Sequence, residues 1–214
     1  DAPPHADDGL TAQQQDRFDR VLQALGQQNL APGCRHLANS AGALRSPQLH
    51  YDMVRVGLAL YGHCPAAHLQ GVTPLQSGMR LLARVSLIRD VPAGVGVSYG
   101  HSFRTKRPSR LAVLGIGYAD GVPRQLSNQM EVLFNGQRLP QVGAITMDQL
   151  VIDATNCSSL ELGSVVTLLG PDGDEEITPG HWSERCQTIP WEILCGFKHR
   201  LPRLHADDES IGAH

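Results

Sequence analysis

The first third of the sequence alternates helical and strand-like patterns. Residues 11–27 predict an amphipathic helix that ends near Gly26, because their apolar positions recur at i, i+3, i+4 and i+7. These positions are Phe18, Val21, Leu22 and Leu25. Thr11 stands where the N-cap of this helix is expected.

A strand, a short helix and a second strand are expected after this helix. They are residues 34–40, residues 41–45 before Pro47, and the apolar run 53–61. Strands that alternate with helices are typical of parallel α/β structures, whose ligand sites gather at the carboxyl ends of the strands. A closed eight-fold barrel needs roughly 250 residues, so this part of the chain fits only a segment of one.

From about residue 75, short strand-like runs separated by Gly and Pro replace the helical pattern. The runs are residues 81–91, 110–118, 131–134, 141–153 and 164–169. Asn135-Gly136 predicts a two-residue type I′ hairpin, because both residues tolerate a positive φ. Residues 179–197 predict one or two short helices. We therefore expect an α/β part in residues 1–74 and a mainly β domain, barrel-like or sandwich-like, in residues 75–214.

Composition and charge exclude several classes of protein. The 214 residues are 41% apolar and 18% charged, which favours a folded globular protein over a disordered one. The 18 basic and 21 acidic residues form no basic block, so the pattern of a nucleic-acid binder is missing. No apolar stretch reaches the roughly 18 residues of a membrane helix. Five cysteines without a Cys-x-x-Cys pair indicate neither a disulfide framework nor a zinc site, so we expect reduced thiols, no metal and a cytoplasmic location.

Common enzyme fingerprints do not match, but another set of motifs does. The Gly-x-Gly pairs at 94–96 and 115–117 lack the third glycine of a dinucleotide-binding loop, and there is no P-loop lysine. The motifs that stand out are His36-Leu-Ala-Asn-Ser40, Asp52-Met-Val-Arg-Val-Gly57, Val97-Ser-Tyr-Gly100, Gly115-Ile-Gly-Tyr-Ala-Asp-Gly121 with Arg124, Met147-Asp-Gln149, Thr188-Ile-Pro-Trp-Glu-Ile-Leu-Cys195 and Arg200-Leu-Pro-Arg203.

With these motifs in order from about Gln13 to Arg203, the sequence resembles the alanine racemase family. The resemblance implies a (β/α)₈ TIM barrel that holds pyridoxal 5′-phosphate, followed by a C-terminal β domain. It implies a homodimer in which the β domain of one subunit covers the barrel mouth of its partner. The implied reaction interconverts L-alanine and D-alanine, which supplies D-alanine for peptidoglycan. The chain then corresponds to the last part of the barrel plus the β domain.

The resemblance assigns the cofactor phosphate to Ser40, Gly57 and Leu58. A hydroxyl and backbone amides at the ends of the last barrel strands are the groups with which such barrels hold phosphate. Taken alone, Ser40 could be a helix cap and Gly57 a packing glycine.

Arg55 interrupts an apolar run, and a buried guanidinium needs an acceptor or an anion. The resemblance points it at the pyridine nitrogen of the cofactor, which it would leave unprotonated because arginine keeps its proton. A weaker electron sink favours racemisation over transamination. A structural pair with Asp52 or Asp120 is the alternative. His36 is expected to orient Arg55, with a core histidine as its alternative role.

Racemisation needs two opposed acid/base groups, because a proton leaves one face of a planar centre and another arrives on the opposite face. The resemblance assigns Tyr99 to one face and the cofactor-bonding lysine to the other. Nearby cations or hydrogen-bond donors must then favour the phenolate, since a free phenol has a pKa of about 10. The alternative for Tyr99 is a half-buried packing residue.

Further residues are assigned to the substrate by resemblance alone. Tyr118 matches the substrate entrance, and Met147 and Asp148 match positions that contact the substrate carboxylate through backbone and narrow the pocket. Strand packing for Tyr118 and Met147, and a turn for Asp148, are the alternatives. Arg124 is assigned to the entrance or to the subunit contact.

The sequence departs from the family in two places. Its only lysines, Lys106 and Lys198, match no cofactor-bonding position, so we expect both to be solvated and the chain to be an inactive C-terminal fragment. Trp191 stands where the family commonly has a phosphate-binding tyrosine, and indole offers one donor of different geometry. Alternatives for the function are a broad-specificity amino-acid racemase, a related pyridoxal phosphate decarboxylase, and a non-catalytic truncated product.

Overall fold

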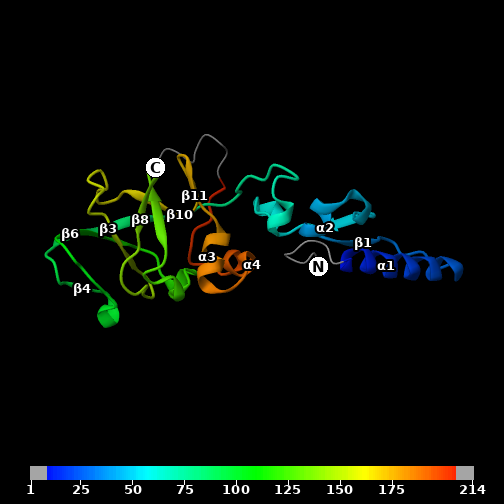
Figure 1. Ribbon diagram of the computed structural model, residues 1–214, viewed down its shortest axis with the longest axis horizontal. Helices are drawn as coiled ribbons and strands as arrows, with labels where there is room; N and C mark the ends of the chain where they lie inside the picture. Colours follow the sequence, from blue (N-terminus) through cyan, green and yellow to red (C-terminus); the bar gives the residue numbers. More distant parts are fainter. Residues whose placement is uncertain (1–8, 206–214) are drawn as a thin grey trace. The chain divides into compact units, whose positions relative to one another are not determined.

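The computed structural model describes residues 9–205, and the chain forms two compact units that divide between Gly78 and Met79 (Figure 1). The first unit is α/β and the second is mainly β, as the sequence predicts. No helix in residues 9–205 is long and apolar enough to cross a membrane. All five cysteines lie in this range as free thiols.

The first unit begins with helix α1 (Leu10–Gln27), which confirms the amphipathic helix. The expected cap at Thr11 is wrong: Thr11 lies inside the helix, and Gly9 takes the N-cap position with φ 82°. The apolar stripe of α1 faces the rest of the unit through Phe18, whose ring meets the ring of Tyr51 edge-on at 5.1 Å.

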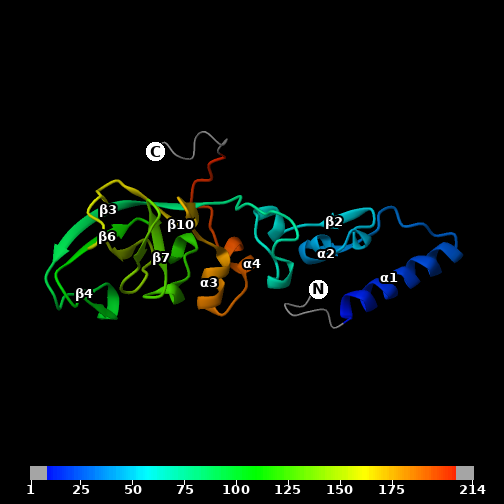
Figure 2. The same ribbon diagram turned by 45° about the horizontal axis from the view of Figure 1, so that its top comes forward.

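Two short parallel strands follow, β1 (His36–Asn39, labelled in Figure 1) and β2 (Met53–Arg55, labelled in Figure 2). In their pairing His36 lies opposite Met53. Helix α2 (Ser40–Arg45) and the 3₁₀ turn η1 (Pro47–Leu49) connect them. The predicted order of helix, strand, helix and strand is therefore confirmed. The parallel pairing places the carboxyl ends of both strands at the same edge, where Ser40 and Gly57 follow them.

The apolar run 53–61 does not form one buried strand, contrary to the prediction. The strand ends at Arg55, and the 3₁₀ turn η2 (Leu58–Tyr61) follows; a further turn, η3, covers Ala67–Leu69. Gly57 turns the chain with φ −117° and ψ −86°, and Met53 is 43% exposed. Apolar composition alone does not distinguish a strand from a short turn of this kind.

The second unit contains a seven-stranded antiparallel sheet in the order β8-β7-β10-β3-β6-β9, with β11 paired to β10. Its strands are β3 (Leu81–Val91), β6 (Ser109–Leu114), β7 (Glu131–Phe134), β8 (Gln137–Pro140), β9 (Leu150–Asp153), β10 (Val165–Asp172) and β11 (Glu175–Ile177). A separate two-stranded ribbon consists of β4 (Gly96–Val97) and β5 (Phe103–Arg104). The β7–β8 hairpin turns at Asn135 (φ 51°) and Gly136 (φ 73°), which confirms the type I′ prediction.

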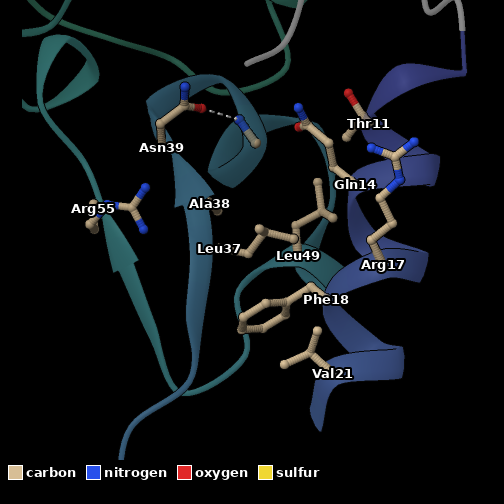
Figure 3. Close-up of a pocket in the computed structure, with 11 residues that line it drawn as sticks. Thr11, Gln14, Arg17, Phe18, Val21, Leu37, Ala38, Asn39, Leu49 and Arg55 are labelled. Carbon is tan, nitrogen blue, oxygen red and sulfur yellow. Dashed lines mark hydrogen bonds between the residues drawn. The ribbon is translucent and has the colours of Figure 1, made fainter. Parts of the chain in front are cut away.

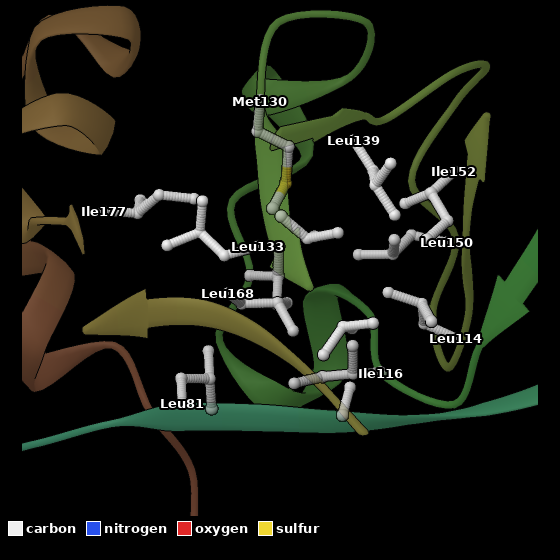
Figure 4. Close-up of a cluster of buried hydrophobic side chains, with 14 of the residues drawn as sticks. Leu81, Leu114, Ile116, Met130, Leu133, Leu139, Leu150, Ile152, Leu168 and Ile177 are labelled. Atoms are coloured by element: carbon white, nitrogen blue, oxygen red, sulfur yellow. The ribbon is translucent and has the colours of Figure 1, made fainter. Parts of the chain in front are cut away.

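The sheet curves towards a barrel around one apolar core. Strand β3 pairs with β10 through its first half and with β6 through its second half, with irregular register in both ladders. A bridge between Gln141 and Ile152 brings the β8 and β9 edges together. The enclosed side chains include Leu81, Leu114, Ile116, Met130, Leu133, Leu139, Leu150, Ile152, Leu168 and Ile177 (Figure 4).

Helices α3 (Pro179–Cys186) and α4 (Pro190–Cys195) confirm the two short helices expected in residues 179–197. Thr178 caps α3 by accepting a hydrogen bond from the His181 amide, and Trp182 is fully buried in the core.

Two predicted strands are shorter than the apolar pattern suggests. Residues 110–118 contain β6 only to Leu114, and the 3₁₀ turn η5 (Tyr118–Asp120) follows; η6 covers Arg124–Leu126. Residues 141–153 contain β9 only from Leu150. The segments outside these strands carry the residues discussed next.

Candidate active site

In the first unit, a hydroxyl and two backbone amides converge at the carboxyl end of the parallel strands. The Ser40 Oγ accepts hydrogen bonds from the amides of Gly57 at 2.9 Å and Ala59 at 3.4 Å. Ser40 is buried, and it does not cap α2: the Asn39 side chain does so by accepting from the Gly42 amide. Gly57 is not a packing glycine, because an added Cβ would meet no atom within 4 Å. The Leu58 side chain is buried.

Arg55 lies beside this cluster with His36 as its partner. Its Nη1 donates to the His36 Nδ1 at 2.7 Å, so His36 accepts at Nδ1 and the expected contact is present. The expectation that Arg55 is buried is wrong: Arg55 and His36 are both exposed. The reason is that β2 pairs only with β1 among the strands of residues 9–205, so no second strand lies along its outer edge.

The alternative pairing of Arg55 with Asp52 or Asp120 is also wrong. Asp52 accepts two hydrogen bonds from the Arg35 guanidinium and one from the Arg35 amide, each at 2.8 Å. These hydrogen bonds lower the pKa of Asp52 from its ordinary value of 3.8 to about 2. Asp120 belongs to the second unit, where other groups bind it. Arg55 therefore has His36, and neither of these carboxylates, as its hydrogen-bond partner, and its charge is available for an anion.

A hollow in the first unit lies between α1 and β1 (Figure 3). Phe18 and Val21 of α1 face Leu37 and Leu49 across it, so its floor is apolar. Arg55 reaches its rim. The polar cluster of Ser40 therefore offers the better place for an anion.

In the second unit, Tyr99 stands on a sharply bent turn. Its side chain is 78% exposed, so it is not the half-buried packing residue of the alternative reading. The turn η4 (Tyr99–His101) follows β4, and Ser98, Gly100 and His101 all have positive φ.

The loop 143–149, named the site loop from here on, connects Tyr99 with the other assigned residues. The Ser98 Oγ donates to the Ala144 carbonyl at 2.7 Å. The Tyr118 and Ala119 amides donate to the carbonyls of Thr146 at 2.9 Å and Met147 at 3.0 Å. Gly117 allows this close approach, because a Cβ there would lie 2.2 Å from the Thr146 carbonyl oxygen. The site loop thus brings the backbones around Tyr99, Tyr118 and Met147 together.

The assigned residues on the site loop and on the neighbouring turns η5 and η6 are exposed to solvent. Met147 is 53% exposed and Tyr118 is 41% exposed, so neither is a core packing residue. Asp148 lies in an exposed turn, and Arg124 is exposed on η6.

Sequence reasoning missed the ion-pair network behind Asp148. Arg200 donates to Asp148 at 2.6 Å and lies 3.4 Å from Asp120, and Asp120 accepts from the Gly117 amide at 2.9 Å. Asp120 is 5% exposed. Asp120 and Arg200 both stand inside the quoted motifs, so the sequence does contain the residues of this network. The spacing along the chain does not show, however, which distant residues form ion pairs.

Three further positions named in the sequence analysis lie in the second unit. Trp191 is in the first turn of α4 and is 38% exposed. Lys106 and Lys198 are both exposed, as expected. Within residues 9–205, no group of three or more His, Cys, Asp or Glu side chains is placed to hold a metal ion.

Comparison with known proteins identifies the family. Residues 78–205 match the model of the alanine racemase C-terminal domain, and residues 2–65 match that of the alanine racemase N-terminal domain. The chain belongs to the alanine racemase family.

Relatives named alanine racemase resemble the chain over nearly all its length. Those of Prochlorococcus marinus and a Nostoc species are 57% and 53% identical to it, over 91% and 92% of the chain. The matches cover 50% and 51% of those relatives, so the chain spans about half their length.

Solved alanine racemases have the same fold over the matched part. The Bacillus anthracis alanine racemase with bound L-Ala-P aligns with a TM-score of 0.88 and 36% identity, over 96% of the chain and 53% of that structure. The Bartonella henselae alanine racemase with covalently bound pyridoxal phosphate aligns with a TM-score of 0.80 and 39% identity, over 94% of the chain and 53% of that structure. The resemblance that the motifs predict is confirmed.

Proposed function

We propose that the protein of which this chain is a part interconverts L-alanine and D-alanine with pyridoxal 5′-phosphate, and that Tyr99 carries one of the two transferred protons. The observation that carries the proposal is the placement of Tyr99: its phenol is 78% exposed, on a turn hydrogen-bonded to the site loop that presents Met147. An acid/base group must reach substrate, and this phenol is free to do so.

The groups of the first unit fit the cofactor. The Ser40 hydroxyl lies against the backbone amides of residues 57–59, and the Gly57 and Ala59 amides donate to its Oγ. A phosphate bound here would replace this oxygen as their acceptor and would also receive the hydroxyl proton. Arg55 offers a permanent cation, and His36 holds it through Nδ1. When bound, the cofactor would withdraw electrons from the substrate and make its Cα–H bond acidic.

Arg55 would bias the outcome of the reaction. Since its guanidinium does not release a proton near neutral pH, it leaves a facing ring nitrogen unprotonated. Charge on the substrate carbon is then less dispersed, and the carbon regains a proton quickly, which favours racemisation over transamination. Trp191 is the weakest assignment to the phosphate, because it offers a single N–H donor.

Met147 and Asp148 would form the wall on the substrate side. The Ala119 amide fixes the Met147 carbonyl, and Arg200 fixes the Asp148 carboxylate, so the peptide between them is held at both ends. A fixed peptide can meet the substrate carboxylate, and the Met147 side chain beside it favours a methyl side chain by narrowing the pocket. Tyr118 stands next to them as part of the entrance.

The second acid/base group is expected outside this chain. Both lysines of the chain are exposed and match no cofactor-bonding position, and the chain spans about half the length of its relatives. The proposal therefore includes a cofactor-bonding lysine in another part of the protein, and a homodimer in which Tyr99 of one subunit serves the partner. It also includes a cytoplasmic location and a role in supplying D-alanine for peptidoglycan.

The test is the turnover of a protein of the relatives' full length that contains this sequence, followed by chiral chromatography of alanine. Tyr99→Phe is expected to reduce L-to-D turnover by about 10² to 10⁴-fold, because a positioned acid/base group contributes that much. Tyr51→Phe is the matched control, because it removes a phenol hydroxyl that donates to Asp19 in the first unit.

Three results would contradict the proposal. Unchanged turnover in Tyr99→Phe would remove Tyr99 from the reaction. Release of carbon dioxide and an amine would favour a decarboxylase, and equal turnover of larger amino acids would favour a broad-specificity racemase.

A further inference from the structure

The turn that carries Tyr99 has a backbone that its own sequence does not favour. Ser98 has φ 59° and ψ −171°, a region that is essentially restricted to glycine. Gly100 (φ 71°) and His101 (φ 47°) continue the bend. Such a conformation persists only where the surroundings over-determine it, so neighbouring groups must hold this turn.

The first group that holds the turn is the site loop. The Ser98 hydroxyl donates to the buried Ala144 carbonyl at 2.7 Å. Gly143 packs directly against the start of the turn, since a Cβ there would lie 2.8 Å from the Val97 carbonyl oxygen and 3.1 Å from the Ser98 Cβ. Ser98 is therefore fixed both by a hydrogen bond and by backbone packing.

Two amide side chains then fix the site loop and the far end of the turn. Gln141 is 2% exposed; its Nε2 donates to the Gly143 carbonyl at 2.8 Å, and its Oε1 accepts from the Asn128 amide at 2.7 Å. The Asn128 Oδ1 accepts from the Gly143 amide at 2.6 Å, and its Nδ2 donates to the Ser102 hydroxyl at 3.1 Å. Both ends of the turn, Ser98 and Ser102, are thus tied to one network.

An exposed side chain depends on its backbone for its location. Tyr99 is 78% exposed, so packing of its ring within the unit contributes little to its position. Proton transfer, by contrast, needs the phenol oxygen within hydrogen-bond reach of the reacting carbon's proton. The backbone of the turn therefore has to supply the precision that side-chain packing does not.

We propose that Ser98, Asn128 and Gln141 are positioning residues that hold the Tyr99 phenol at the place where the proton is transferred. This inference rests on the proposed function for its chemistry, but the holding of the turn is a property of the chain itself. The three residues act through the backbone of residues 97–102 and touch no substrate.

The test begins with the full chain labelled with 3-fluorotyrosine. The four tyrosines give four ¹⁹F resonances, which single Tyr→Phe variants assign. Ser98→Gly removes the side-chain hydroxyl, and glycine tolerates the positive φ of this position. Asn128→Gly removes the side-chain amide, and glycine likewise tolerates the φ of 62° at residue 128. Asn128→Asp keeps an acceptor for the Gly143 amide and is the conservative variant. Ser86→Ala is the matched control, because its hydroxyl donates to the Val113 carbonyl at 3.1 Å on β3, away from the turn.

In both glycine variants, amide hydrogen exchange of residues 97–102 is expected to rise about ten-fold or more, and the Tyr99 resonance alone is expected to move. Asn128→Asp should restore most of the protection, and Ser86→Ala should change neither signal. Unchanged exchange and an unchanged Tyr99 resonance in Ser98→Gly and Asn128→Gly would overturn the proposal, whatever the activity.

Kinetics of the full-length protein complete the test. The glycine variants are expected to lower kcat by about 10- to 100-fold with little change in KM, because a small misplacement of a reacting group has a cost of that order. A loosened turn with unchanged kcat would overturn the positioning role. Absence of racemisation in the unsubstituted protein would instead refute the proposed function, while exchange and ¹⁹F spectra would still decide whether these residues hold the turn.

Discussion

Replacing Asp120 by alanine is expected to destabilise the second unit and to loosen the site loop. Asp120 is 5% exposed, and its Oδ2 accepts from the Gly117 amide at 2.9 Å. Its Oδ1 lies 3.4 Å from the Nε of Arg200, which in turn binds Asp148. The substitution removes the only acceptor that the structure gives the Gly117 amide within residues 9–205, and it also removes one of the two carboxylates that Arg200 faces.

The size of the effect follows from these contacts. A hydrogen bond to a charged group contributes about 1.5–3 kcal/mol, and a buried N–H left without a partner costs about 1–3 kcal/mol. Both figures describe the same contact and do not add, so we expect Asp120→Ala to lower the free energy of unfolding by about 1.5–3 kcal/mol. The Arg200 side chain is 53% exposed, so solvent screens its ion pair with Asp120 and this pair adds little to the stability.

Urea unfolding followed by tryptophan fluorescence measures this loss. Both tryptophans, Trp182 and Trp191, lie in the second unit, so the signal reports on that unit. With a slope of about 1–3 kcal/mol per molar urea, the midpoint should fall by roughly 0.5–3 M.

Asp120→Asn is the matched variant for this prediction. Its amide oxygen keeps the hydrogen bond from Gly117 and loses only the charge, so we expect it to retain most of the stability. An Asp120→Ala midpoint equal to that of the unsubstituted chain would refute the reasoning. Equal losses in both variants would show that the charge, and not the hydrogen bond to Gly117, supplies the stability.

Two further predictions concern the first unit and the sharing of sites. Arg35 lowers the pKa of Asp52 from 3.8 to about 2. The stabilisation of the folded state by this pair is therefore fully present above about pH 4 and is lost as the pH falls through 2. A carboxyl NMR titration of Asp52 should show the low midpoint, and Arg35→Gln should return it towards 3.8; an unchanged midpoint in that variant would contradict the assigned cause. If Tyr99 serves the partner subunit, mixing full-length Tyr99→Phe and Arg55→Ala proteins should restore about a quarter of the unsubstituted turnover, because half of the dimers are mixed and each holds one intact site. No recovery in verified mixed dimers would refute the sharing of sites.

The sequence predicted well those elements that local physics determines. The Asn135-Gly136 hairpin forms because both residues tolerate a positive φ, and this preference needs no distant contact. Strand β3 has the predicted bounds because a long alternating run has one buried face. The order of helix, strand, helix and strand in the first unit follows from the local spacing of its apolar residues, which also needs no distant contact.

The errors occur where distant groups decide the outcome. Arg55 was expected to be buried because its neighbours in sequence are apolar, but exposure depends on which strands lie beside β2. The run 141–153 was expected to be a strand, yet Gln141 and Asn128 fold residues 143–149 into a loop through hydrogen bonds across 13 and 15 residues. The motifs identify the residues of the candidate site, but their spacing does not show which other groups hold those residues in position.

The site loop illustrates why motif residues and holding residues differ. Met147 and Tyr118 are exposed, and neither has packing that would fix its position. Their backbones are fixed by amide-to-carbonyl hydrogen bonds, which any sequence can form once Gly117 allows the close approach. The groups that impose this arrangement are the side chains of Gln141, Asn128 and Asp120, which lie behind the loop. Gln141 and Asn128 lie outside the motifs, so a substitution of either leaves every motif residue unchanged in sequence and is still expected to loosen the turn that carries Tyr99.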